Sequence, residues 1–353
     1  MRGIKPSAIG RAMALFAAAM LALAALPSAA VAQSASLRIP YLGYPADQQL
    51  ALNGKPVVSP EDAAIDRAIR TQIIRVRKGQ KYEPHPAIWK ISDADTTIYL
   101  FGTIHSLPYG FRWRNPGLDA VIARADLLLL ESLSDDNEQV SFVAGVQGGE
   151  AGLIPLADRV SRRYRPQMIA LQQALPDDLV AQLDAMPTWL AAITIGSIRD
   201  MQAGEIETAG ADDWLERHFL AVGRPVEAIE DNQQVVINLN GISEKAQRQM
   251  LEAALISQPS EAAAIDRPAH AWAQGEVGPD SPLIIHPRDL DPSAAMAAPL
   301  LDDRNAAWTD DLIRRLDERP GVTLFAAGAG HFVGPGSVIE RLEARGIRVE
   351  RVQ

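Results

Sequence analysis

Two histidines stand where their side chains could bind a metal ion or move a proton. His105 ends the segment GTIH at 102–105, and His331 ends GAGH at 328–331, so both follow the pattern G-x-x-H. Each segment continues a short apolar stretch, and a third apolar stretch leads into Glu131. Imidazole and carboxylate groups are metal ligands and also act as general bases or acids. These residues therefore predict one shared site.

The apolar stretches before these residues have the character of buried parallel strands, which are apolar along their whole length. They lie at Ile98–Phe101, Leu127–Leu130 and 322–326. Because the carboxyl ends of parallel strands lie along one edge of an open α/β sheet, ligands and catalytic groups gather there. A fourth strand, predicted at Pro225–Ile229, leads into Glu230 and adds a second candidate carboxylate.

A histidine after a strand is commonly a structural residue that forms a hydrogen bond. Two G-x-x-H segments, both emerging from predicted buried strands, favour a shared site over two unrelated structural histidines. The other histidines lie in proline-flanked or helical contexts, and we interpret them as surface or structural residues: His85, His218, His270 and His286.

The remaining pattern completes an α/β arrangement with a mostly helical middle, from about 155 to 275. We expect helices at about 59–76, 115–125, 212–221, 302–318 and 337–346, and a final strand at 347–352. Ser337 and Glu340 have capping-box spacing, and Gly346 is a suitable stop for the helix that they open. The alternation of strands and helices predicts a mixed or largely parallel sheet with flanking helices.

The first 32 residues have the pattern of a secretory signal peptide. A basic start precedes an apolar run over 12–26, and Ala30 and Ala32 supply the small residues of a cleavage site. We expect cleavage after Ala32 and a periplasmic or secreted mature protein. No later stretch is long and apolar enough to span a membrane. Residues 33–86 then form an N-terminal extension whose role the sequence does not indicate.

Composition excludes several classes of function. The 353 residues contain 34 basic and 44 acidic side chains, and this acidic balance argues against a nucleic-acid partner. The absence of cysteine excludes a thiolate nucleophile and cysteine-ligated metals. The sequence has no HExxH, GxSxG or phosphate-loop motif. The glycines at 328–334 precede the next predicted helix by several residues, so we expect no nucleotide cofactor.

The chain resembles the TraB/GumN family from about Ile88 to its C-terminus. The first matching pieces are IWKI at 88–91, IYLFGTIHSLP at 98–108 and the strand that ends in Glu131. The last are Arg304-Asn305 followed by Trp308, and the segment FAAGAGHFVGPGSVIERLEARGIRVERV. Between them, GADDWLERHFLAVGRPVEAIED and AWAQGE also resemble family segments. The family includes the Tiki metalloproteases and is more remotely related to erythromycin esterase and ChaN-like proteins.

The resemblance implies an erythromycin esterase/ChaN-like α/β core over 87–353, with a helical insertion at about 155–275. For the Tiki branch it implies a peptidase that uses Mn, Co or Zn. Carried over to this sequence, it implies His105, Glu131 and His331 as metal ligands and catalytic residues. Further candidates are Glu230, Arg304 and Asn305. The last two lie in the first turn of a predicted helix, where a structural role is equally compatible with the sequence.

Three functions follow from these observations. The first is an exported metal-dependent peptidase or amidase that acts on peptides or other small molecules. The second keeps the same residues but uses a histidine as general base without metal, as the erythromycin esterase relatives are thought to do. The third is a periplasmic regulatory protein that binds a peptide or small ligand without turnover. The sequence does not indicate the substrate, the identity of the metal or the oligomeric state.

Overall fold

The computed structural model describes residues 60–133, 154–202, 207–231, 237–256, 267–284 and 301–353. The predicted signal peptide, its cleavage site after Ala32 and His286 lie outside these ranges. The first described element is the helix α2 (Pro60–Gly79), where the sequence predicts a helix. In the ranges given above, no helix has the length and apolar character needed to cross a bilayer.

The protein is built on a six-stranded mixed sheet, which confirms the predicted α/β class. Its strands lie in the order β6-β4-β7-β2-β1-β8. Neighbours from β6 to β2 pair in parallel, whereas β1 is antiparallel to both β2 and β8. The strands are β1 (Ile88–Ser92), β2 (Thr96–Thr103), β4 (Leu127–Leu130), β6 (Val226–Ala228), β7 (Gly321–Gly328) and β8 (Glu350–Arg351).

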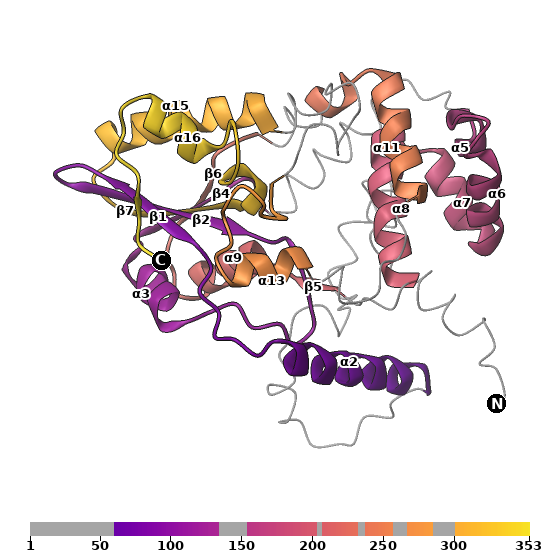
Figure 1. The fold of residues 1–353 in the computed structure, drawn as a ribbon, viewed down its shortest axis with the longest axis horizontal. Helices are drawn as coiled ribbons and strands as arrows, with labels where there is room; N and C mark the ends of the chain where they lie inside the picture. The colour runs from indigo at the N-terminus through magenta and orange to yellow at the C-terminus, as the bar shows by residue number, and fades with distance from the viewer. Residues whose placement is uncertain (1–59, 134–153, 203–206, 232–236, 257–266, 285–300) are drawn as a thin grey trace.

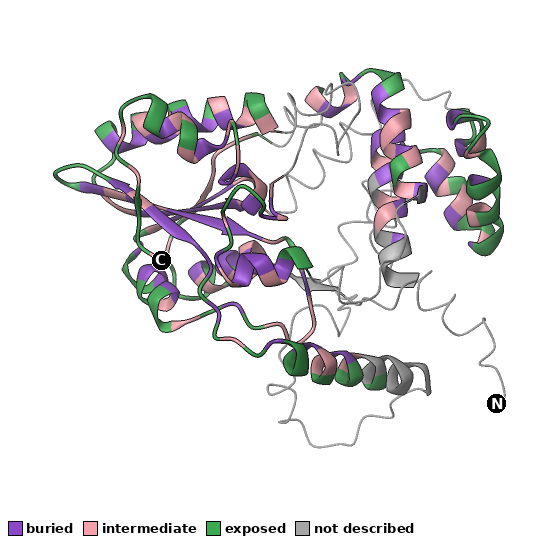
Figure 2. Ribbon diagram, in the orientation of Figure 1, coloured by how far each residue is buried: buried purple, intermediate pink, exposed green. Residues whose placement is uncertain are grey.

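Helices cover both faces of this sheet, which explains why its central strands are apolar throughout. Figure 1 shows α15 (Asp303–Glu318) and α16 (Val338–Ala344) on one side. On the other side lie α3 (Pro116–Arg124), α9 (Ala211–Ala221) and α13 (Arg267–Ala273). The central strands are buried between these layers, as Figure 2 shows.

Local signals position several of these elements as the sequence predicts. The Asn115 side chain accepts a hydrogen bond from the backbone of Leu118 and caps α3, and Ser337 caps α16 through Glu340 N. The final strand is shorter than the predicted 347–352. The backbone N–H of Ile347 donates to Leu342 at the end of α16 instead of to a strand. β8 itself spans two residues, and beyond it Val352 N still donates to Ile88 O of β1 at 2.9 Å.

A second, two-stranded sheet fixes the chain just after β2. It pairs β3 (Ser106–Pro108) with β5 (Glu207–Ala209) in antiparallel register. The same contact continues into α9, because Ala211 N donates to Ile104 O at 3.0 Å. The end of β2 is thereby joined to the start of α9.

The helices of the middle segment form a unit with a separate hydrophobic core. They are α5 (Leu156–Arg159), α6 (Arg165–Ala174), α7 (Asp177–Asp184), α8 (Thr188–Gln202) and α11 (Glu244–Ile256). Figure 1 shows this unit beside the sheet. Its core includes Leu156, Leu183, Ile195 and Leu251, whereas α9 and α13 pack into the core of the sheet.

Candidate functional site

The carboxyl ends of the central strands meet at one edge of the sheet. In the β2–β7 register, Thr103 pairs with Gly328, and in the β4–β7 register Leu130 pairs with Ala326. The residues that follow these strands therefore lie together. The sheet thus brings His105, Glu131 and His331 into one neighbourhood.

Gly328 lies at the centre of these three side chains. A Cβ atom added to Gly328 would be 3.2 Å from Glu131 Oε1, 3.4 Å from His105 Nε2 and 3.6 Å from His331 Cδ2. The backbone N–H of Gly328 also donates to Glu131 Oε1 at 2.5 Å. The three groups thus surround a space the size of one methyl group, which we call the Gly328 cradle.

His331 is buried and held in one orientation by Asn305. Asn305 Nδ2 donates to the carbonyl of Gly336 at 3.0 Å, which leaves its Oδ1 to accept from His331 Nδ1 at 2.6 Å. The proton of a neutral ring is therefore on Nδ1, and the lone pair of Nε2 accepts a hydrogen bond from Arg304 Nη1 at 3.3 Å, which a metal ion at Nε2 would have to displace. Burial lowers the pKa of His331 to about 4, so the ring is neutral at physiological pH.

His105 is held in the same way by a carboxylate. Its Nδ1 donates to Asp212 Oδ2 at 2.8 Å, while its Nε2 lies beside the cradle. The hydrogen bond to Asp212 raises the pKa of His105 to about 9, although 62% of the side chain is exposed. Without a ligand, His105 is therefore protonated at neutral pH.

Arg304 joins the two carboxylates that follow β4 and β6. Its Nη2 donates to Glu131 Oε2 at 2.7 Å, and its Nε donates to Glu230 Oε2 at 2.9 Å. Nη1 lies 3.3 Å from His331 Nε2, and the guanidinium packs over the ring of Trp308. The sequence-predicted site residues thus form one network with Trp308 and Asp212, in which His105 bonds to Asp212 and meets the other residues only across the Gly328 cradle.

Burial and charge act differently on the two carboxyl groups of this network. Burial would raise the pKa of Glu131, but the charges of His331, Arg304 and His105 bring it below its ordinary value. At Glu230, burial prevails over the Arg304 contact and raises the pKa. The pKa of Glu131 consequently lies below that of Glu230.

Asp212 and Trp308 are the members of this network that our sequence analysis does not select. Asp212 reaches His105 because Gly210, two residues before it, packs directly against the backbone that follows β2. A Cβ atom added to Gly210 would be 2.1 Å from Ile104 O, so the close approach requires glycine. Trp308 Nε1 donates to Glu230 Oε2 at 3.1 Å. Acidic residues in a first helical turn are common for electrostatic reasons alone, so the sequence signal at Asp212 is weak.

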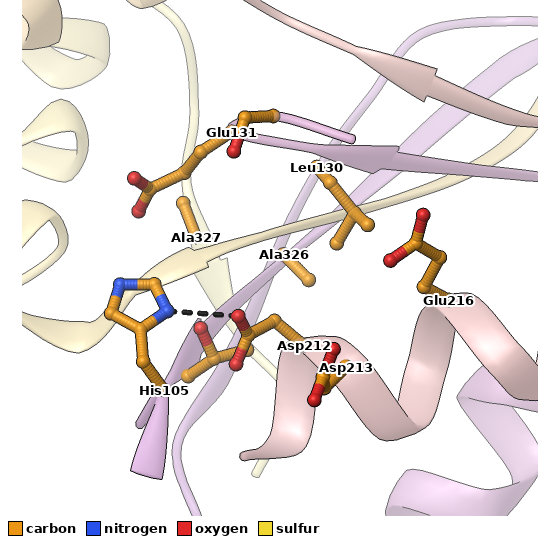
Figure 3. Close-up of a pocket in the computed structure, with 10 residues that line it drawn as sticks. His105, Leu130, Glu131, Asp212, Asp213, Glu216, Ala326 and Ala327 are labelled. Atoms are coloured by element: carbon orange, nitrogen blue, oxygen red, sulfur yellow. Dashed lines mark hydrogen bonds and ion pairs between the residues drawn. The ribbon is translucent and has the colours of Figure 1, made fainter. Parts of the chain in front are cut away.

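A pocket of about 90 Å³ opens beside His105. Figure 3 shows Glu131 at the end of β4 on one side of it, and Asp212, Asp213 and Glu216 on α9. Thus His105 and Glu131 belong both to the network and to the wall of a pocket that could receive a substrate group.

Three of the other histidines lie outside this network. His270 Nδ1 contacts the Tyr82 hydroxyl, His85 Nδ1 contacts the Glu83 carbonyl, and His218 stacks on Trp214. These contacts are those of structural and surface residues.

A family model described as the TraB/PrgY/gumN family matches residues 87–351, which is more than half of the chain. The chain belongs to the TraB/PrgY/gumN family. The match runs from the residue before β1 to the last residue of β8, so the whole six-stranded sheet is TraB/PrgY/gumN-like. Comparisons with curated proteins and with solved structures gave no match.

The Asp212–His105 contact predicts a measurable titration in this TraB/PrgY/gumN protein. NMR should give His105 a pKa of about 9, and Asp212→Asn should lower it by at least about one unit because the negative partner is lost. The contact stabilises the fold fully below the unfolded-state pKa of about 6.5, and this contribution is lost as pH rises through about 9. Asp119→Asn is the matched control. An unchanged pKa in Asp212→Asn would contradict the prediction.

Proposed function

We propose that this TraB/PrgY/gumN protein is an exported hydrolase that cleaves amide bonds in peptides or other small molecules with the help of a divalent metal. His105, Glu131 and His331 would hold the metal and carry the chemistry. The observation that carries the proposal is the arrangement of both histidines around the Gly328 cradle. Each is fixed through Nδ1 by an oxygen acceptor and directs the rest of its ring toward Glu131.

The residues fit a divalent metal in type and orientation. Metal-ligating histidines characteristically donate their other ring N–H to a carboxylate or another oxygen, as His105 does to Asp212 and His331 to Asn305. In the described ranges, no three His, Asp or Glu side chains are grouped closely enough to hold an ion as they stand. Glu131 Oε1 lies 3.9 Å from His331 Nε2, so binding would draw the ligands together.

A divalent metal held by these residues would lower the pKa of a water molecule bound to it and would polarise the carbonyl group of the substrate. The chain's own residues have separate tasks. Asp212 and Asn305 orient the two imidazoles, and the Gly328 N–H holds Glu131. Arg304 places a buried positive charge beside Glu131, where it would stabilise negative charge that develops on a substrate oxygen.

Metal analysis of the mature chain from Gln33 tests this function. We expect near-stoichiometric Mn, Co or Zn in the wild type and at least a tenfold loss of bound metal in His105→Ala and in His331→Ala. Both variants should keep their fold and lose cleavage of a peptide library. His85→Ala, outside the network, is the matched control. Normal turnover in either site variant would contradict the proposal.

The hydrogen bond between His105 and Asp212 also supports a second candidate, a hydrolase that works without metal. In it, Asp212 would orient His105, which would act as the general base. A wild-type protein that neither contains nor binds Mn, Co or Zn, yet cleaves peptides faster as pH rises toward 9, would favour this mechanism. Saturable peptide binding without any product would instead favour a ligand-binding protein.

The location of the protein is part of the proposal. The basic and apolar pattern of residues 1–32 supports export, with the mature chain beginning at Gln33. N-terminal sequencing of the protein from a periplasmic or secreted fraction tests it. An intact Met1 in cells that express the full chain would contradict export.

A further inference from the structure

The helix α2 lies outside both the family match and the candidate site. One of its faces packs against the loop that follows β3. A Cβ atom added to Gly110 would be 3.0 Å from Ile73 Cγ2, and Val76 on the same face is buried. Just after the helix, the buried Gln80 accepts a hydrogen bond from Arg112 N at 2.8 Å. The helix is thus fixed to the protein by one face, which leaves the opposite face to solvent.

The solvent-facing side of α2 is basic. The segment 67–81 contains six basic side chains and no acidic one, although the whole chain has 34 basic and 44 acidic residues. Exposed positions recur at intervals of three or four residues, as on one face of an α-helix. Figure 2 shows exposed residues along the helix. We call this surface the α2 basic face, and it consists of Arg67, Arg70, Thr71, Ile74, Arg77 and Lys78, followed by the exposed Lys81.

The charge of this face is not neutralised by neighbouring carboxylates. Arg70 has contacts of its own. Elsewhere on the surface, exposed arginines pair with acidic groups, as Arg165 does with Asp158 at 2.6 Å. Such ion pairs with described residues are absent for Arg67, Arg77, Lys78 and Lys81. Several like charges on one exposed face attract an extended anionic surface.

An apolar side chain within the basic face distinguishes between anionic partners. Ile74 is 68% exposed and lies within one helical turn of Arg77 and Lys78. A soluble polyanion offers charged groups but no apolar layer for this isoleucine. A bilayer offers both, because its acyl chains begin just beneath the headgroups. Clusters of about four to eight Lys or Arg residues on an amphipathic helix are typical of proteins that bind anionic lipid.

We propose that the α2 basic face binds the surface of an anionic phospholipid bilayer. The basic side chains contact headgroup phosphates, and Ile74 enters the layer beneath them. A helix of 20 residues is about 30 Å long, so its charges reach several headgroups at once. The acidic excess of the whole chain disfavours contact through other surfaces, which gives binding a single orientation. The inference is independent of the proposed hydrolysis.

Co-sedimentation of the mature chain from Gln33 with lipid vesicles tests the inference, because this chain lacks the apolar run 12–26. We expect it to bind vesicles of equal parts phosphatidylglycerol and phosphatidylcholine at least about tenfold more tightly than pure phosphatidylcholine. Raising NaCl from about 50 mM to about 500 mM should weaken this binding at least about tenfold, since salt screens exposed charges.

Variants on the basic face identify the residues responsible. Arg77→Gln combined with Lys78→Gln should weaken binding to the anionic vesicles at least about tenfold, because each basic residue near such a surface strengthens binding about fivefold. Ile74→Ser should weaken it about threefold without changing the salt dependence. The matched control combines Arg162→Gln with Arg163→Gln, which removes the same charge from two exposed neighbours in the middle segment. The control should bind as wild type, and circular dichroism checks that all variants are folded.

Several results would overturn the inference. One is the absence of binding to anionic vesicles, or equal binding to pure phosphatidylcholine. Another is an equal loss in the basic-face variant and in the control, because net charge alone would then explain binding. A third is tight binding of inorganic polyphosphate together with unchanged vesicle binding in Ile74→Ser, which would make the partner a soluble polyanion.

Discussion

Replacing Gly328 with alanine is expected to lower kcat/KM for peptide cleavage by at least about 100-fold, with little change in stability. Gly328 has φ −50° and ψ 133°, which alanine adopts without strain. The added methyl group would fill the cradle, 3.2 Å from Glu131 Oε1 and 3.4 Å from His105 Nε2. A displacement of about 1 Å at reacting groups is enough for a loss of this size.

Kinetics, metal analysis and thermal unfolding of Gly328→Ala check this expectation together. The matched control is Gly278→Ala, since a Cβ at Gly278 meets no atom within 4 Å. The control should behave as wild type in all three measurements. Full activity and full metal content in Gly328→Ala would show that the chemistry takes place away from the cradle.

Replacing Arg304 with glutamine is expected to lower the free energy of unfolding by about 3–5 kcal/mol. The Arg304 side chain is 15% exposed and lies between Glu131 and Glu230, which are 15% and 13% exposed. Removing the guanidinium leaves two buried carboxylates close together without their main positive partner. Denaturant unfolding at neutral pH measures the loss.

Two further variants identify the cause of that loss. Arg314→Gln, in the same helix but half exposed, should leave the free energy of unfolding close to that of the wild type. Combining Glu230→Gln with Arg304→Gln should recover part of the lost stability. The double variant removes the Glu230 charge, which Arg304→Gln alone leaves buried without its positive partner. A cost below about 1 kcal/mol for Arg304→Gln alone would contradict the assigned role of Arg304.

The strand ends of this protein are predictable because the signal is local and strong. The stretch at 127–130 is apolar at each position, and β4 occupies those four residues. The rule that parallel strands end on one edge then brings Glu131 near His105 and His331. The capping residues Asn115 and Ser337 are equally local, since each bonds to an N–H three residues later.

The parts that sequence reasoning leaves out depend on packing between distant elements. Asp212 contacts His105 only because α9 begins against the end of β2, and no periodicity in either segment encodes that approach. The role of Asn305 depends on the carbonyl of Gly336, 31 residues away. The β3–β5 sheet has three residues in each strand, too few for an alternating pattern to be recognised.

The strand order has a consequence for when the candidate site can form during synthesis. β7 lies between β2 and β4, although it is the second-last strand among the residues that the structure describes. During synthesis, β2 and β4 therefore leave the ribosome long before the strand that separates them. Among the residues of the site, Gly328 and His331 are likewise synthesised after all the others. A nascent or C-terminally truncated chain accordingly carries an incomplete sheet and no assembled Gly328 cradle, so the proposed hydrolysis would begin only after the last strands are synthesised.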